Sequence, residues 1–139
     1  MKLGIKSIGY IRTEELSLPY FTRKQSVKID ESALNLIPIT ELSGTFDERS
    51  AEDAAGIYRE VSASASMPYD EAKYESIAEA VTGDYCFVVE DMEDNRCLVG
   101  TNRYRATMEI RREVDEFNKN VIRFEIKHKS PHGALPLRR

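Results

Sequence analysis

The chain has 139 residues, of which 41% are hydrophobic and 32% are charged, and its net charge is −4 at pH 7. This length predicts a single domain, residues 1–139, that buries one core without metal or disulfide support. The longest apolar run, Tyr85–Val89, is far shorter than the ~20 residues of a membrane-spanning helix. The first residues lack the hydrophobic stretch of a signal peptide. We therefore expect a folded cytoplasmic protein that contacts no membrane.

Charge is distributed unevenly along the chain. Residues 1–29 carry a net charge of +4, residues 30–94 carry −14 and residues 95–139 carry +6. A fold that interleaves these segments has a mixed surface, whereas a fold that separates them has one acidic and one basic face. Separate faces would favour head-to-tail stacking of copies. The basic residues are spread over many segments of an acidic chain, which argues against nucleic acid as a partner.

The N-terminal third predicts short strands. Residues 3–12 alternate apolar and polar side chains and change phase in the middle, which indicates a strand with a β-bulge. Residues 25–29 form a second extended run. Residues 34–39 are apolar, but Pro38 restricts them to an edge strand or an irregular segment.

The acidic middle of the chain predicts a loop, a strand and a helix. Residues 43–55 are polar and contain a glycine, so we expect a long, mobile loop. Residues 56–67 predict a strand whose small Ser and Ala side chains allow another element or subunit to approach, or which is simply half-exposed. Residues 69–82 predict an amphipathic helix with acidic residues in its first turn and Gly83 after its end. Its apolar stripe consists of Tyr74, Ile77, Ala78 and Val81.

The C-terminal part predicts one antiparallel hairpin followed by a second hairpin or a meander. Residues 85–90 and 96–101 flank a turn-rich segment, and residues 105–114 and 121–128 alternate apolar and polar side chains. Residues 129–139 are rich in Pro and Gly and predict a loose tail that is frayed or docked on a neighbour. The predicted fold class is α+β, a mostly antiparallel sheet of six to eight strands with one helix packed on it.

The two cysteines, Cys86 and Cys97, fall on the two arms of the first hairpin. A turn centred on Glu93–Asp94 places Cys97 opposite Glu90, which leaves the two sulfurs too far apart for a disulfide. We expect free thiols, with Cys86 packed in the core as a small hydrophobic side chain.

Catalytic, cofactor and metal sites are not predicted. The chain lacks a glycine-rich phosphate loop and a Gly-x-Ser-x-Gly motif. His128 and His132 have the spacing of a helical metal pair, but Pro131 and Gly133 argue against a helix there. The acidic residues of the first hairpin turn lack the glycine and closing glutamate of an EF-hand loop, so a solvated turn is favoured.

One resemblance adds to this interpretation. Over residues 84–128 the segments Phe87–Asp91 and Asn95–Thr101 resemble a hairpin of small structural proteins from prophage and tailed-phage gene clusters. That hairpin reads approximately val-val-x-asp, turn, x-leu-ile-gly, although the turn here lacks its usual glycine. The resemblance implies a virion assembly subunit, of the tail or the head–tail connection, that works by oligomerising. It implies no catalytic residues.

The leading hypothesis is therefore a non-enzymatic structural subunit that associates with itself and with other virion proteins, in the host cytoplasm or in a virion. Candidate interface residues are Asp47, Glu48, Glu52, Asp53, Glu93, Asp94, Arg138 and Arg139. The alternative is a monomeric domain that binds a small molecule or peptide between sheet and helix. Tyr58, Tyr69, Tyr74 and Tyr85 are the candidate lining residues of that pocket.

Overall fold

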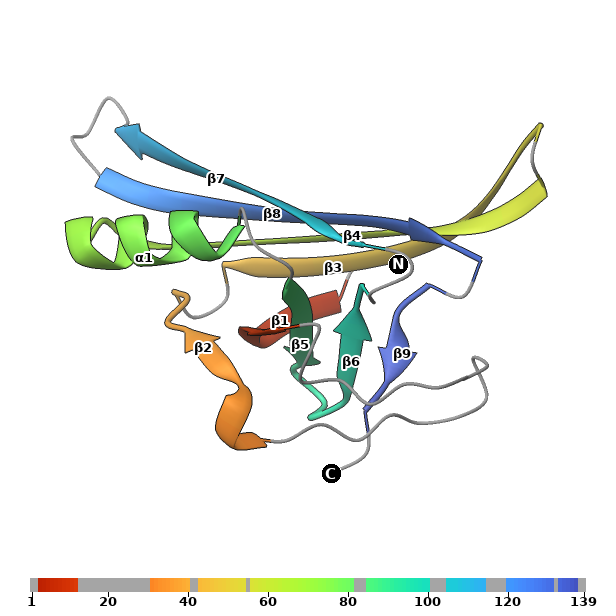
Figure 1. The fold of residues 1–139 in the computed structure, drawn as a ribbon, viewed down its shortest axis with the longest axis horizontal. Coiled ribbons are helices and arrows are strands. Elements are labelled where there is room, and N and C mark those ends of the chain that lie inside the picture. Colours follow the sequence, from red (N-terminus) through yellow and green to blue (C-terminus); the bar gives the residue numbers. More distant parts are fainter. Residues whose placement is uncertain are drawn as a thin grey trace.

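The fold was analysed in a computed structural model (Figure 1). The described residues are 3–12, 31–40, 43–54, 56–81, 85–100, 105–114, 120–131 and 133–137. They form a mostly antiparallel sheet with one α-helix, which confirms the predicted α+β class. The elements are β1 (Leu3–Arg12), a 3-10 helix (Glu31–Ala33), β2 (Asn35–Ile37), β3 (Gly44–Asp53), β4 (Gly56–Pro68), α1 (Glu71–Val81), β5 (Tyr85–Asp91), β6 (Arg96–Val99), β7 (Thr107–Val114), β8 (Asn120–Ser130) and β9 (Leu135–Pro136).

The strands form one sheet that folds over on itself. Their order is β7-β8-β4-β3-β1-β5-β6-β9, with β2 paired to β1. Strands β7, β8, β4 and β3 make the upper half in Figure 1, and β1, β5, β6 and β9 lie beneath it. The halves join at a short ladder in which Leu3–Ile5 pairs with Gly44–Phe46. The main core fills the space between the halves and is capped by α1.

Alternation along the strands determines which side chains enter the core. On β8, Ile122, Phe124 and Ile126 are buried, as their spacing predicts. Their neighbours on β4 are Met67, Ala65 and Ala63. The alanines of β4 thus lie beside the large side chains of β8, and this volume matching explains why alanine occupies the core face of the strand.

Several predicted elements are confirmed. Strand β1 contains the predicted irregularity, a register shift between Ile5 and Ser7 in its pairing with β5. Helix α1 begins after Asp70, whose carboxylate accepts a hydrogen bond from the amide of Lys73 (3.1 Å). Ile77 on its apolar stripe is buried. The expected strand at residues 25–29 lies outside the described residues.

The expected loop at residues 43–55 is wrong, because Gly44–Asp53 forms the ten-residue strand β3. Its polar side chains have low intrinsic strand propensity, but nine residue pairs with β4 override that preference. The described strands therefore number nine, one more than the predicted upper limit. The additional strands include β2 and β9, which are only three and two residues long.

The C-terminal segment is also more ordered than its composition predicts. Strand β8 continues to Ser130, and Leu135 and Leu137 are buried. They join a second core cluster with Cys86 and other residues of β1, β5 and β6. Two hydrogen bonds hold the connecting segment, from the Gly133 amide to Ser130 Oγ (2.8 Å) and from the Ala134 amide to Glu48 Oε1 (2.9 Å). The leucines therefore dock on this chain's own sheet.

The β5–β6 hairpin has a register one residue away from the predicted one. Cys97 lies opposite Val89 and not opposite Glu90. The cause is a three-residue turn whose last residue, Asp94, has the left-handed φ of 66°. The Asp91 carboxylate supports the turn by accepting hydrogen bonds from the amides on either side of Asp94 (2.8 and 3.0 Å). Aspartate thus occupies the position for which glycine is the usual residue.

Candidate interaction surfaces

A β-hairpin arm projects from the body of the protein. We define the arm as the described residues Ala51–Asp53 of β3 and Gly56–Tyr58 of β4. They pair with each other, whereas the ladder between β4 and β8 ends at Arg59 and the ladder between β3 and β1 ends at Phe46. Among the described strands, none flanks the arm on either side. The arm is the extension at the right of Figure 1.

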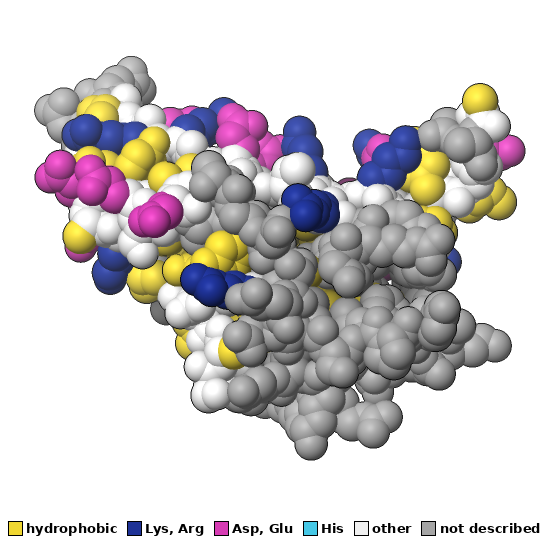
Figure 2. All heavy atoms as spheres, viewed as in Figure 1, with side chains coloured by type: hydrophobic (Ala, Val, Ile, Leu, Met, Phe, Trp, Pro, Cys, Tyr) yellow, Lys and Arg dark blue, Asp and Glu magenta, His cyan; other side chains and the backbone are white. Residues whose placement is uncertain are grey.

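Hydrophobic and charged side chains gather on this projection (Figure 2). Ile57 is 74% exposed, although it shares its strand face with the buried residues Val61 and Ala63. The face is therefore the core face, continued past the point where the opposite half of the protein ends. An exposed apolar residue in this position is available to a partner chain.

The base of the arm is held by polar contacts on the outer face of the sheet. Arg49 forms an ion pair with Glu60 across the β3–β4 ladder (2.9 Å). The ammonium group of Lys129 on β8 lies 3.8 Å from the centre of the Tyr58 ring. Such contacts between exposed groups are weak individually, but together they fix the direction in which the arm leaves the body.

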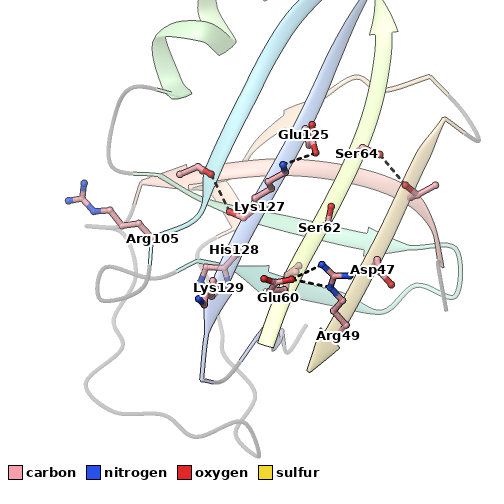
Figure 3. A pocket seen from close by; sticks show the side chains of 13 residues that line it. Asp47, Arg49, Glu60, Ser62, Ser64, Arg105, Glu125, Lys127, His128 and Lys129 are labelled. Carbon is pink, nitrogen blue, oxygen red and sulfur yellow. Dashed lines mark hydrogen bonds and ion pairs between the residues drawn. The ribbon is translucent and has the colours of Figure 1, made fainter. Parts of the chain in front are cut away.

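The outer face of β3, β4 and β8 carries a hollow of about 870 Å³ (Figure 3). Its floor is formed by Ser62 and Ser64, and Ser64 Oγ lies 3.0 Å from the Thr45 hydroxyl. Lys127 forms an ion pair with Glu125 beside the floor (3.4 Å). Strand β3 is acidic and strand β8 is basic, and β4, which carries one arginine and one glutamate, lies between them. Acidic and basic side chains therefore share this face.

A second hollow of about 420 Å³ lies between β3, the β5–β6 hairpin and the C-terminal segment. Phe46, Val89 and Leu137 provide apolar walls, and Glu48 and Asp94 are among the polar lining residues. Asp94 also forms an ion pair with Lys6 (2.6 Å). We call this hollow the tail cleft.

The structure separates the predicted interface residues. Glu48 and Asp94 line the tail cleft, whereas Asp47 lies on the outer sheet face, in the larger hollow. Glu52 is exposed on the arm, and Glu93 is exposed at the β5–β6 turn. The side chain of Asp53 and both terminal arginines, Arg138 and Arg139, lie outside the described residues. The described members of this set therefore lie in four separate places: the tail cleft, the outer sheet face, the arm and the β5–β6 turn.

The predicted tyrosine-lined pocket is not assembled either. Tyr74 of α1 lies next to Tyr69, which precedes the helix, with ring centres 6.0 Å apart. Tyr85 packs edge-on against Tyr10 (5.3 Å), and Tyr58 is at the base of the arm. These tyrosines lie in three separate places, and none of the four lines the tail cleft.

The sequence does not predict the arm, because the composition of residues 43–55 indicates a loop. Phe46 is the only large apolar residue of Gly44–Asp53, so an apolar/polar alternation that would indicate a strand is absent there. Gly56 adopts a φ of 124°, which favours glycine and helps close the hairpin.

The described thiols lack the environment of a nucleophile. Burial raises the pKa of Cys86 to about 12 and the pKa of Cys97 to about 12. Both cysteines are free, as their spacing predicts. His128 is buried on the inner face of β8, and His132 is not among the described residues. The described part of the chain contains no cluster of three or more His, Cys, Asp or Glu side chains placed to hold a metal ion.

The only α-helix among the described residues has 11 residues, and no helix there has the length and apolarity to span a bilayer. Comparison with protein-family models, with curated proteins and with solved structures found no match to this chain. The interpretation of its function therefore depends on the surfaces described above.

Proposed function

We propose that this chain is a non-enzymatic assembly subunit that works by binding other protein chains, including copies of itself. The observation that carries the proposal is the arm, a two-stranded projection with Ile57 exposed on the continuation of the core face. A two-stranded ribbon alone is at best marginally stable in water. An arm that extends past its own core gains stability when a partner covers it.

The energetic argument for a protein–protein contact at the arm depends on the side chain of Ile57. Burying an isoleucine stabilises a contact by about 1.5–3 kcal/mol, and Ile57 is the most exposed of the large hydrophobic residues described. The arm also carries the exposed carboxylate of Glu52. An apolar centre beside a charged group is the usual composition of a protein–protein contact.

The biological setting that we propose is a phage or prophage particle, with the protein in the host cytoplasm before assembly and in the virion afterwards. The support is the resemblance of the β5–β6 hairpin to virion structural proteins. The partners are then further copies of this chain and the neighbouring virion subunits.

Replacing Ile57 with aspartate should weaken self-association at least tenfold, by roughly the loss of one central apolar contact. The measurement is light scattering after size exclusion over a range of protein concentrations, at low and high salt. Leu36→Asp is the matched control, because Leu36 is 66% exposed on β2, away from the arm. A wild-type chain that stays monomeric at every concentration and salt would contradict the proposal.

The tail cleft favours a second candidate function, a monomeric domain that binds a small molecule or peptide. Its volume of about 420 Å³ falls within the ~300–1,000 Å³ of ligand pockets, and apolar walls with a few polar groups are typical of them. This function is distinguished from assembly by a ligand that raises the melting temperature of a monomer.

A further inference from the structure

Strand β7 is one edge of the sheet. Among the described residues only β8 pairs with it, through eight residue pairs from Thr107 to Val114. The backbone N–H and C=O groups on its other side therefore face no described strand. Such an edge is a template on which another strand can add.

The outer face of β7 places like charges side by side. Glu109 lies opposite Glu125 on β8, and Arg111 lies opposite Arg123. Like charges in directly opposite positions destabilise a sheet. Glu113 relieves the basic pair in part, through ion pairs with Arg111 (3.0 Å) and with Arg123. Opposite charges directly beside Glu109 and Arg111 can be supplied from the side of β7 that pairs with no described strand.

We propose that β7 pairs antiparallel with β7 of a second copy of this chain, about a two-fold axis at Ile110. This inference rests on the proposed function as an assembly subunit and names one of its contacts. In this register Glu109 lies opposite Arg111 of the second copy, and Arg111 lies opposite Glu109 of the second copy. The two-fold symmetry forms both charge pairs at once.

Charge selects this register over its neighbours. With the axis at Arg111, that arginine faces itself and Glu109 faces Glu113 of the second copy. With the axis at Glu109, two glutamates meet at the centre. A shift by a single residue brings outer-face side chains opposite inner-face side chains. The register centred on Ile110 is the one in which Glu109 and Arg111 both meet an opposite charge.

The inner face of the same register brings Ile110 and Val114 opposite apolar residues of the second copy, and it places Arg112 opposite Met108. Ile110, which is half-buried in the single chain, meets Ile110 of the second copy. Val114 is 57% exposed at the end of β7, and it lies opposite Ala106 of the second copy. The pairing thus covers an exposed hydrophobic residue that the single chain leaves in water.

The test uses two charge-reversal variants, Glu109→Arg and Arg111→Glu. Each variant alone faces like charges across the two-fold axis, so its dimer dissociation constant should rise roughly tenfold or more. Each also gains an opposite charge from β8, so the monomer fold is not weakened at that pair. In an equimolar mixture the two variants present opposite charges to each other, and we expect a heterodimer with close to wild-type affinity. Glu93→Arg, at the exposed β5–β6 turn, is the charge-matched control.

The mass of each sample is measured by sedimentation and native mass spectrometry, in the wild-type and the Ile57→Asp backgrounds. An oligomeric wild type whose mass is unaffected by either β7 variant would overturn the β7 pairing and leave the proposed function standing. A wild-type chain that is monomeric at every concentration would overturn both the β7 pairing and the proposed function. The charged side chains of β7 would then be interpreted as groups that prevent this edge from pairing with another strand. Loss of the dimer in each variant and its recovery in the mixture would support the pairing.

Discussion

Replacing Gly44 with alanine is expected to lower the free energy of unfolding by about 2–3 kcal/mol, because the added methyl group has no space. A Cβ atom at this position would lie 2.6 Å from Cβ of Ile5, the residue directly opposite on β1. Directly opposite Cβ atoms in antiparallel strands are normally about 4.5–5.5 Å apart. Ile5 is buried in the core between the two halves, so it cannot move out of the way.

The effect is large because of where the clash occurs. Three residue pairs, Leu3–Ile5 with Gly44–Phe46, join the two halves of the sheet through β1 and β3. Widening this corner also separates the halves and loosens the core between them. The entropy that alanine removes from the unfolded chain offsets only about 0.4–1 kcal/mol of this loss.

Gly4→Ala is the matched control on the same ladder. A Cβ on Gly4 would lie 3.2 Å from Cγ of Met92, an exposed, flexible side chain that can rotate away. Its effect should stay within about 0.5 kcal/mol. Both variants are measured by urea denaturation, with the slope checked for two-state behaviour. Equal losses of stability in the two variants would show that the corner is not tightly packed.

Local patterns in the sequence were sufficient to predict the elements that alternate cleanly. The phase change in residues 3–12, the stripe of α1 and the alternation of β7 and β8 each depend on a few neighbouring residues. These are the elements in which intrinsic preference and burial agree.

Strand β3 could not be predicted in this way, because its stability comes from residues far along the chain. Most of its side chains from Thr45 to Asp53 are polar or charged, and each of these residues pairs with β4. The exposure of the arm could not be predicted from local sequence patterns either. Ile57 has the spacing of a core residue, and only the three-dimensional structure shows that the core ends before reaching it.

The two proposed contacts belong to the same half of the sheet. Pairing of β7 with β7 of a second copy about a two-fold axis uses the same edge of both chains, so this contact alone produces a dimer and nothing larger. The arm leaves from β3 and β4, two strands further into the sheet. Each dimer has two projecting arms that are able to bind further subunits. The β7 contact and the arm contact together can therefore build an assembly larger than a dimer.

Replacing Phe124 with alanine is expected to be the most damaging single change in the core, lowering the free energy of unfolding by about 3–5 kcal/mol. Phe124 is 1% exposed and lies on β8 between Ala65 of β4 and Ile110 of β7. Loss of its ring leaves a cavity in the upper half of the sheet that a small neighbour such as Ala65 cannot fill. Denaturant unfolding measures the loss, and Ile57→Ala is the control, because a residue 74% exposed should change stability by less than about 0.5 kcal/mol.

A second substitution tests whether volume matching between β4 and β8 is the cause. Ala65→Leu alone adds volume beside Phe124 and should cost about 1–3 kcal/mol. In the Phe124→Ala background the same leucine enters the vacated space, so the double variant should be more stable than the sum of the two losses predicts. Additive losses would mean that Ala65 and Phe124 do not share one space, and the small side chains of β4 would then need a different explanation.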